Sequence, residues 1–214
     1  MRQIRADLWE TRTDSPFPGL TTHAYLWTAG AGGNVLFYST ATDADFDGLD
    51  HLGGVRHQYL SHRDEAGPML ASIRQRFGAR LHAPGPERVE ISAHASVDVP
   101  LEDRHVDAAG IEVIPTPGHT PGSTCYLLTG ADGLRYLFTG DTVFEGADGT
   151  WVAGFIPPIS DADALAQSLQ LLRTLTPDVV ISSAFPSDNA VHMLDGRPWA
   201  ECVDQALAGL FARS

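Results

Sequence analysis

One turn constrains this chain more than any other segment. It reads Thr116-Pro-Gly-His-Thr-Pro-Gly-Ser123 and lies between two apolar runs, at residues 110–115 and 123–128. Proline fixes φ and glycine allows positive φ, so this pattern predicts one rigid connection between two strands. The rigid backbone aims His119, the turn's one titratable side chain, without needing a packed core around it. A preset imidazole suits a metal ligand or an acid–base group, and the alternative is a stiff hairpin with an incidental surface histidine.

Two other predicted strands also end in titratable side chains. Residues 134–139 are predicted as a strand, and Asp141 follows it beside a glycine, where its carboxylate is open to a cleft. Upstream, another predicted strand is followed by His62, Asp64 and Glu65. Loops carry functional residues more often than the elements that they connect. Three strand ends therefore each offer an imidazole or a carboxylate.

The order and spacing of these segments resemble the metallo-β-lactamase-fold hydrolases. The family pattern is His-x-His-x-Asp-His after a strand, then Pro-Gly-His-Thr-Pro-Gly-Ser, then Gly-Asp, and finally a late His in a Pro-Gly-His turn. The second and third elements are nearly verbatim here, at residues 117–123 and 140–141. The resemblance covers most of the chain and implies an α/β (α+β) fold, a four-layer αββα sandwich of two mixed sheets flanked by helices. Periodicity alone predicts only mixed α/β structure.

The first and last elements of the family pattern are degenerate in this chain. With a two-residue gap, His62 takes the first His position, Asp64 takes the Asp position, and Glu65 stands where the last His should be. This alignment is preferred because the Ala-Gly-Pro that follows then continues as the family does. Without a gap, Asp64 falls on the second His instead. The late His position falls on Ala184, and His192, a few residues later, cannot be assumed to replace it.

By position, the resemblance implies a metal site formed by His62, His119 and Asp141. Two imidazoles, one carboxylate and water can make a catalytic zinc site, and the same set is the facial triad of non-haem iron. The second metal of the family lacks its nitrogen ligands here, so we expect at most one ion, zinc, with iron or no metal as alternatives. A bound water would be the nucleophile, and Asp64 or Glu65 would act as a base or orient a ligand.

The predicted function is metal-dependent hydrolysis of a small ester, lactone, thioester or phosphodiester. One alternative is a metal-free, non-catalytic member of the fold that binds a ligand, and another is an iron redox enzyme. Trp151 and Phe155 belong to a glycine-rich loop after Asp141. They are expected either to line an apolar substrate pocket or to pin this loop onto the core.

Net charge, length and the apolar stretches limit which partners and which cellular compartment are expected. The 214 residues carry a formal net charge of −13, which disfavours nucleic acid and anionic membranes as partners. The length fits a single domain, residues 1–214, acting on a small molecule. No long apolar stretch or apolar leader is present, which predicts a cytoplasmic protein, and the oligomeric state is left open. Cys125 and Cys202 lack metal-site spacing and are expected to be buried.

Hydrophobic periodicity predicts helices after Pro68, Ser160 and Pro198, with Ser160 as the N-cap of the second. A packing role is expected for His23, which lies on a predicted strand. Residues 84–109 carry only short strand signals and are otherwise expected to be irregular. The histidines in or near this segment are expected on the surface: His82, His94 and His105.

Overall fold

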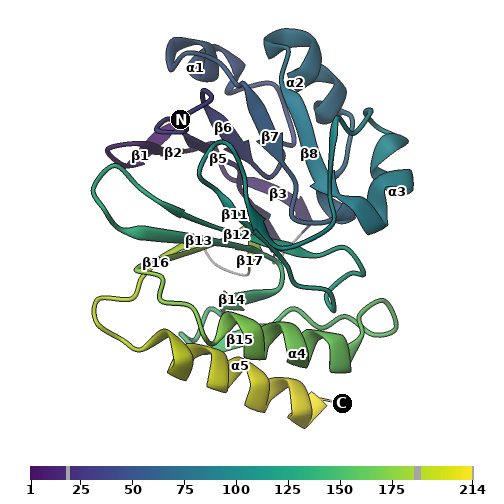
Figure 1. The fold of residues 1–214 in the computed structure, drawn as a ribbon, viewed down its shortest axis with the longest axis vertical. Helices are drawn as coiled ribbons and strands as arrows, with labels where there is room; N and C mark the ends of the chain where they lie inside the picture. The colour runs from purple at the N-terminus through teal and green to yellow at the C-terminus, as the bar shows by residue number, and fades with distance from the viewer. Residues whose placement is uncertain (18–19, 186–188, 214) are drawn as a thin grey trace.

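The structure is a computed structural model that describes residues 1–17, 20–185 and 189–213. Its elements form four layers, with two sheets packed face to face between two layers of helices (Figure 1). Three helices cover the first sheet: α1 (Phe46–His51), α2 (Met69–Phe77) and α3 (Arg88–Ser92). Two helices cover the second sheet: α4 (Ala162–Leu172) and α5 (Trp199–Arg213). The expected αββα arrangement is confirmed.

The first sheet has seven strands in the order β1-β2-β5-β6-β7-β8-β9. The pairs from β1 to β6 are antiparallel and those from β6 to β9 are parallel, so the sheet is mixed. Its strands are β1 (Arg2–Arg5), β2 (Leu8–Glu10), β5 (Tyr25–Trp27), β6 (Val35–Phe37), β7 (His57–Tyr59), β8 (Arg80–Pro84) and β9 (Val99–Leu101).

The second sheet has six strands in the order β10-β11-β12-β13-β16-β18, with β13 and β16 parallel and the other pairs antiparallel. Its strands are β10 (His105–Val106), β11 (Glu112–Pro115), β12 (Thr124–Thr129), β13 (Arg135–Gly140), β16 (Val179–Ser182) and β18 (Val191–Met193). A small sheet and a hairpin complete the strands: β3 (Asp14–Phe17), β4 (Leu20–Thr22) and β17 (Ala184–Phe185), then β14 (Val143–Glu145) with β15 (Trp151–Ala153).

Along the central strands, successive apolar side chains point alternately into two cores, one between the sheets and one under the helices α4 and α5. On β12, Tyr126 and Leu128 belong to the core between the sheets, whereas Cys125 and Leu127 belong to the core under α4 and α5. Successive side chains of a strand point to opposite faces, so a sheet covered on both sides reads as a nearly continuous apolar run. Both cysteines are buried, as expected.

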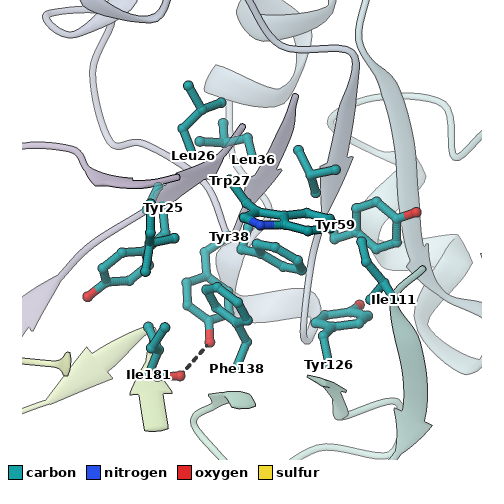
Figure 2. Packing of buried hydrophobic residues seen from close by; sticks show 14 of the residues in the cluster. Tyr25, Leu26, Trp27, Leu36, Tyr38, Tyr59, Ile111, Tyr126, Phe138 and Ile181 are labelled. Atoms are coloured by element: carbon teal, nitrogen blue, oxygen red, sulfur yellow. Dashed lines mark hydrogen bonds between the residues drawn. The ribbon is translucent and has the colours of Figure 1, made fainter. Parts of the chain in front are cut away.

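Tyr38 joins the two sheets beside the loop that carries Asp141. It follows β6 with a positive φ of 70°, and its ring is buried. Its hydroxyl donates to the Ile181 carbonyl on β16 at 2.9 Å, as Figure 2 shows, and accepts from the Gly140 backbone N–H at 3.0 Å. The side chain thus couples the position of the first sheet to the end of β13.

Helix α2 begins directly after Pro68 and ends at Gly78, whose φ of +67° favours glycine. The N-cap of α4 is Asp161, not Ser160, because the Asp161 carboxylate accepts from the Ala164 N–H at 2.9 Å. Residues 84–109 are more regular than expected, since they form a 3-10 helix, η2 (Gly85–Glu87), then α3 and two strands. No helix in the described ranges combines the length and apolarity needed to cross a membrane.

Candidate metal centre

Three strand ends meet at one point of the structure. His62 follows β7, His119 lies in the turn between β11 and β12, and Asp141 follows β13. One ligand atom from each lies within 4.8 Å of the other two. Nε2 of His62 is 3.6 Å and Nε2 of His119 is 3.8 Å from the same oxygen, Asp141 Oδ2. The segments that the sequence singled out therefore converge on one cluster of two imidazoles and a carboxylate.

The turn that carries His119 is held by helix α4. The turn closes through the Thr116 N–H, which donates to the Ser123 carbonyl at 2.7 Å. Gly118 has a φ of +137°, and a Cβ at this position would lie 2.3 Å from the Leu165 backbone of α4. Proline and glycine therefore fix the turn, as expected. The alternative of an incidental surface histidine was wrong, because His119 is only 3% exposed.

The tautomer of His119 follows from one backbone carbonyl. Its Nδ1 lies 2.7 Å from the Gly154 carbonyl oxygen, which can only accept, so Nδ1 carries the proton. Burial, followed by the nearby charge of His62, lowers the pKa of His119, which leaves the ring neutral. Its Nε2 is buried and has no hydrogen-bond partner among the described residues. A buried lone pair aimed at a carboxylate is costly unless a cation or donor satisfies it, and it fits a metal ion.

His62 is oriented from behind by Ser61 and Glu65. Its Nδ1 lies 2.8 Å from Ser61 Oγ and 3.4 Å from Glu65 Oε1. The Ser61 hydroxyl and N–H both donate to the Glu65 carboxylate, at 2.5 and 2.8 Å. These contacts turn Nε2 of His62 toward Asp141. Residues 63–65 form the 3-10 helix η1 (Arg63–Glu65), which gives the chain the short reversal that this arrangement needs.

Asp141 is fixed by a serine that sequence reasoning missed. The Ser183 hydroxyl donates to Asp141 Oδ1 at 2.5 Å, which leaves Oδ2 toward the two histidines. Ser183 sits between β16 and β17, 42 residues from Asp141, and no motif marks it. Asp64 is the exposed carboxylate of the group, at 55% side-chain exposure, with Oδ2 4.0 Å from His62 Nε2.

The cluster opens into a cavity of about 450 Å³, which is large enough for a small molecule. All five expected polar residues line it: His62, Asp64, Glu65, His119 and Asp141.

The described residues that line this cavity do not include Trp151 or Phe155. Trp151 is 2% exposed and packs edge-on against Trp199 of α5, with ring centroids 5.3 Å apart. Phe155 is partly buried against the same core. The substrate-binding expectation is therefore corrected, and the alternative, pinning the loop onto the core, describes these two residues.

Several other histidines lie outside the cluster. Nδ1 of His192 lies 2.6 Å from Glu145 Oε2, and its ring packs on Trp151, so it does not replace the late His. His23 is buried with Nδ1 3.0 Å from Glu10 Oε1, although its ring also borders the cavity. His82 was wrongly expected on the surface: it is 8% exposed, and its Nε2 lies 2.9 Å from Nδ1 of His57.

Metal affinity should depend on pH through His62. Burial acts to lower the pKa of His62, but Asp141, Glu65 and Asp64 outweigh it and raise the pKa to about 9. The ring is thus an imidazolium near pH 7, and an ion must displace its proton. We expect zinc binding near pH 7 to release about one proton, and the affinity to rise with pH until about pH 9. Titration calorimetry in buffers of different ionisation enthalpy measures this; no proton release would contradict the assignment of His62 as a ligand.

Truncation of Trp151 should affect stability rather than the site. Trp151→Ala removes a buried indole between β15 and α5, so we expect the free energy of unfolding to fall by about 3–5 kcal/mol. Phe211→Ala, at a side chain 63% exposed on the same helix, should change it by less than about 0.5 kcal/mol. Urea unfolding compares the two. A loss of metal binding in folded Trp151→Ala without a loss of stability would contradict the core assignment.

The four-layer fold and the cluster of two histidines and a carboxylate agree with one protein family. Residues 47–184 match the family model of the metallo-beta-lactamase superfamily, and the chain belongs to this superfamily.

Two of the proteins that this chain is similar to are named as hydrolases. The chain is 30% identical over 185 residues to a hydroxyacylglutathione hydrolase of Rhizobium meliloti (strain 1021), covering 85% of this chain and 66% of that protein. It is 40% identical over 82 residues to a probable polyketide biosynthesis zinc-dependent hydrolase of Bacillus velezensis, covering 37% of this chain and 32% of that protein. The chain thus spans less than two thirds of the length of each of these relatives.

A solved metallo-beta-lactamase from Pontibacter korlensis matches the structure with a TM-score of 0.74. The match covers 98% of this chain and 97% of that one at 18% identity, which shows a common fold.

Proposed function

We propose that this chain is a hydrolase that holds one metal ion through His62, His119 and Asp141 and cleaves a small ester, lactone, thioester or phosphodiester. The observation that carries the proposal is the buried Nε2 of His119, which faces Asp141 without a hydrogen-bond partner among the described residues. Proteins rarely leave such an atom unsatisfied. A cation between the two histidines and the carboxylate would satisfy it.

The donor set fits a catalytic zinc ion. Two neutral imidazoles and one carboxylate give three protein ligands and an open position, as in catalytic zinc sites, and ferrous iron accepts the same set. When bound, the ion supplies a water of lowered pKa and polarises the substrate oxygen. Within the described ranges, a group of three metal-ligating side chains close enough to share an ion occurs once, at these residues, which supports one ion and not two.

The two neighbouring acids take different roles in this proposal. Glu65 accepts two hydrogen bonds from Ser61 and faces the rear nitrogen of His62, so it serves as a positioning residue. Asp64 is half exposed on the cavity wall beside His62 Nε2 and is placed to accept a proton from an attacking water. Of the two acids that the sequence offered as a base, the geometry favours Asp64.

Among the four substrate classes, the thioester has one further line of support. The relative from Rhizobium meliloti is a hydroxyacylglutathione hydrolase, which acts on a thioester. The chain covers only 66% of that protein. The similarity therefore supports a thioester as the bond that is cleaved more than it supports glutathione as the thiol part of the substrate.

A metal-free ligand-binding protein is the second candidate. His62 Nε2 lies 3.6 Å from Asp141 Oδ2, and the pKa of His62 is raised to about 9. An imidazolium at this position neutralises part of the acidic cluster without a metal ion. The fold would then keep the cavity for binding alone.

Metal content and hydrolysis distinguish the two candidates. We expect untagged protein to contain about one equivalent of zinc or iron by elemental mass spectrometry. We also expect it to hydrolyse at least one of a model ester, lactone, thioester and phosphodiester, to lose this activity with a chelator, and to regain it with zinc. Protein that takes up no metal, and whose melting temperature does not respond to zinc, would instead support the metal-free candidate.

A further inference from the structure

We infer that the cavity selects a substrate that is electrically neutral and carries an apolar acyl group, and that it rejects anionic carriers. This inference rests on the proposed function for the reaction, but its basis is the wall of the cavity.

The first observation is the absence of lysine and arginine from the described part of the cavity wall. The described wall residues include three carboxylates, Asp64, Glu65 and Asp141, and no arginine. The chain contains no lysine, and the one arginine whose side chain is not described is Arg213, the last residue of α5. Three carboxylates outweigh the charge of a protonated His62 or of a bound divalent ion, so an anionic carrier would lose hydration in a net negative cavity without gaining an arginine or lysine to pair with.

Arg63, the arginine that is nearest in sequence to His62, is paired with acidic side chains. Arg63 follows His62, but its guanidinium lies 3.8 Å from Glu87 and 3.5 Å from Glu90. Its backbone N–H donates to Glu87 as well, at 2.7 Å. Both acids are outside the cavity wall. Nε of Arg63 also lies 4.0 Å from Oδ1 of Asp64, a wall residue, but Arg63 itself is not among the described residues of the wall.

The second observation is an apolar part of the wall, built by three separate elements. Leu20 comes from β4, Met69 from the start of α2, and Ile156 from the segment after β15. Ile156 is 48% exposed, so the apolar surface continues outward. Methionine adapts to acyl groups of varied shape, and apolar walls with few polar groups are typical of small-molecule sites.

The remaining polar groups of the wall include several hydroxyls. Thr22, Ser39 and Thr40 lie on it and can hydrogen-bond to a neutral carbonyl or amide without a charge. Of the three acids, Glu65 and Asp141 already accept bonds from Ser61 and Ser183. Asp64, at 55% side-chain exposure, is the most exposed of the three acids. One exposed carboxylate is a weak binding site for a cation, so a neutral substrate is expected to bind better than a cationic one.

The test uses thioethers that share one alkyl chain and cannot be hydrolysed. S-hexyl-N-acetylcysteamine is neutral, S-hexylglutathione carries two carboxylates and one ammonium, and S-hexylcysteamine carries one ammonium. By calorimetry with zinc-loaded protein, we expect the neutral compound to bind about tenfold more tightly than S-hexylglutathione. Equal or tighter binding of S-hexylglutathione, tightest binding of the ammonium compound, or no binding of any of them would overturn the inference.

Adding a positive charge to the wall provides an independent check. Met69→Arg places a guanidinium at the cavity and should narrow or invert the preference against S-hexylglutathione. Met193→Arg, at a side chain 39% exposed on β18 outside the cavity wall, adds the same charge and should leave the preference unchanged. An equal effect of both variants would show that net charge, and not the wall, sets the preference.

Hydrolysis separates this inference from the proposed function. The hexanoyl thioesters of N-acetylcysteamine and glutathione are compared with the same protein. If neither is cleaved while the neutral thioether still binds preferentially, the inference stands and thioester hydrolysis fails. If the glutathione thioester is cleaved faster, the inference fails while the hydrolase proposal stands.

Discussion

Replacing His119 with alanine is expected to reduce the metal content from about one equivalent to near zero and to abolish hydrolysis. The change removes one of the two imidazoles that face Asp141, and the remaining pair, His62 and Asp141, cannot supply three protein ligands. Among the described residues, the hydrogen bond of this side chain is the one to the Gly154 carbonyl, so its removal deletes one bond from the fold. We therefore expect a folded, metal-free protein.

The measurement is elemental mass spectrometry after dialysis, with circular dichroism to confirm folding. His94→Ala is the matched control, because His94 is exposed and lies on a different part of the chain; it should keep its metal. Glu65→Gln should also keep about one equivalent, since Glu65 contacts the rear of His62 and not the ion site. Two equivalents of metal in wild-type protein, or full metal content in His119→Ala, would contradict the proposed site.

Gly154→Ala is expected to damage the same site without replacing a ligand. A Cβ on Gly154 would lie 1.8 Å from the Asp141 carbonyl oxygen and 3.1 Å from Nδ1 of His119. The backbone must therefore move, and with it the carbonyl that sets the tautomer of His119. We expect metal affinity to fall by about 10- to 100-fold, as when a group that orients a ligand is lost, with a parallel fall in hydrolysis.

Gly209→Ala is the control for this substitution. Gly209 lies in α5, and a Cβ there has no neighbour within 4 Å. Alanine should stabilise the helix by up to about 1 kcal/mol and leave metal affinity unchanged. Competition with a chromophoric chelator reports the affinity of both variants. Wild-type affinity in Gly154→Ala would show that the backbone contact to His119 does not position the ligand.

Local patterns in the sequence were enough to find the strand ends that form the cluster. Proline and glycine fix the turn around His119, and an apolar run that ends in Gly140 places Asp141 at a strand terminus. These features depend on φ preferences and on residue alternation, which act over a few neighbouring residues. The layered fold followed from the resemblance that these motifs carry.

The contacts that complete the site were decided by the tertiary structure alone. Ser183 reaches Asp141 across 42 positions of sequence, and the Gly154 carbonyl sets the tautomer of His119 across 35. Neither partner has a sequence signature, because a serine or a glycine carbonyl is common and only its place in space makes it useful. Trp151 shows the same limit, since a large apolar side chain suits a pocket wall and a core equally well. Which of these it joins depends on where α5 packs, and that is settled by burial over the whole chain and not by any local pattern.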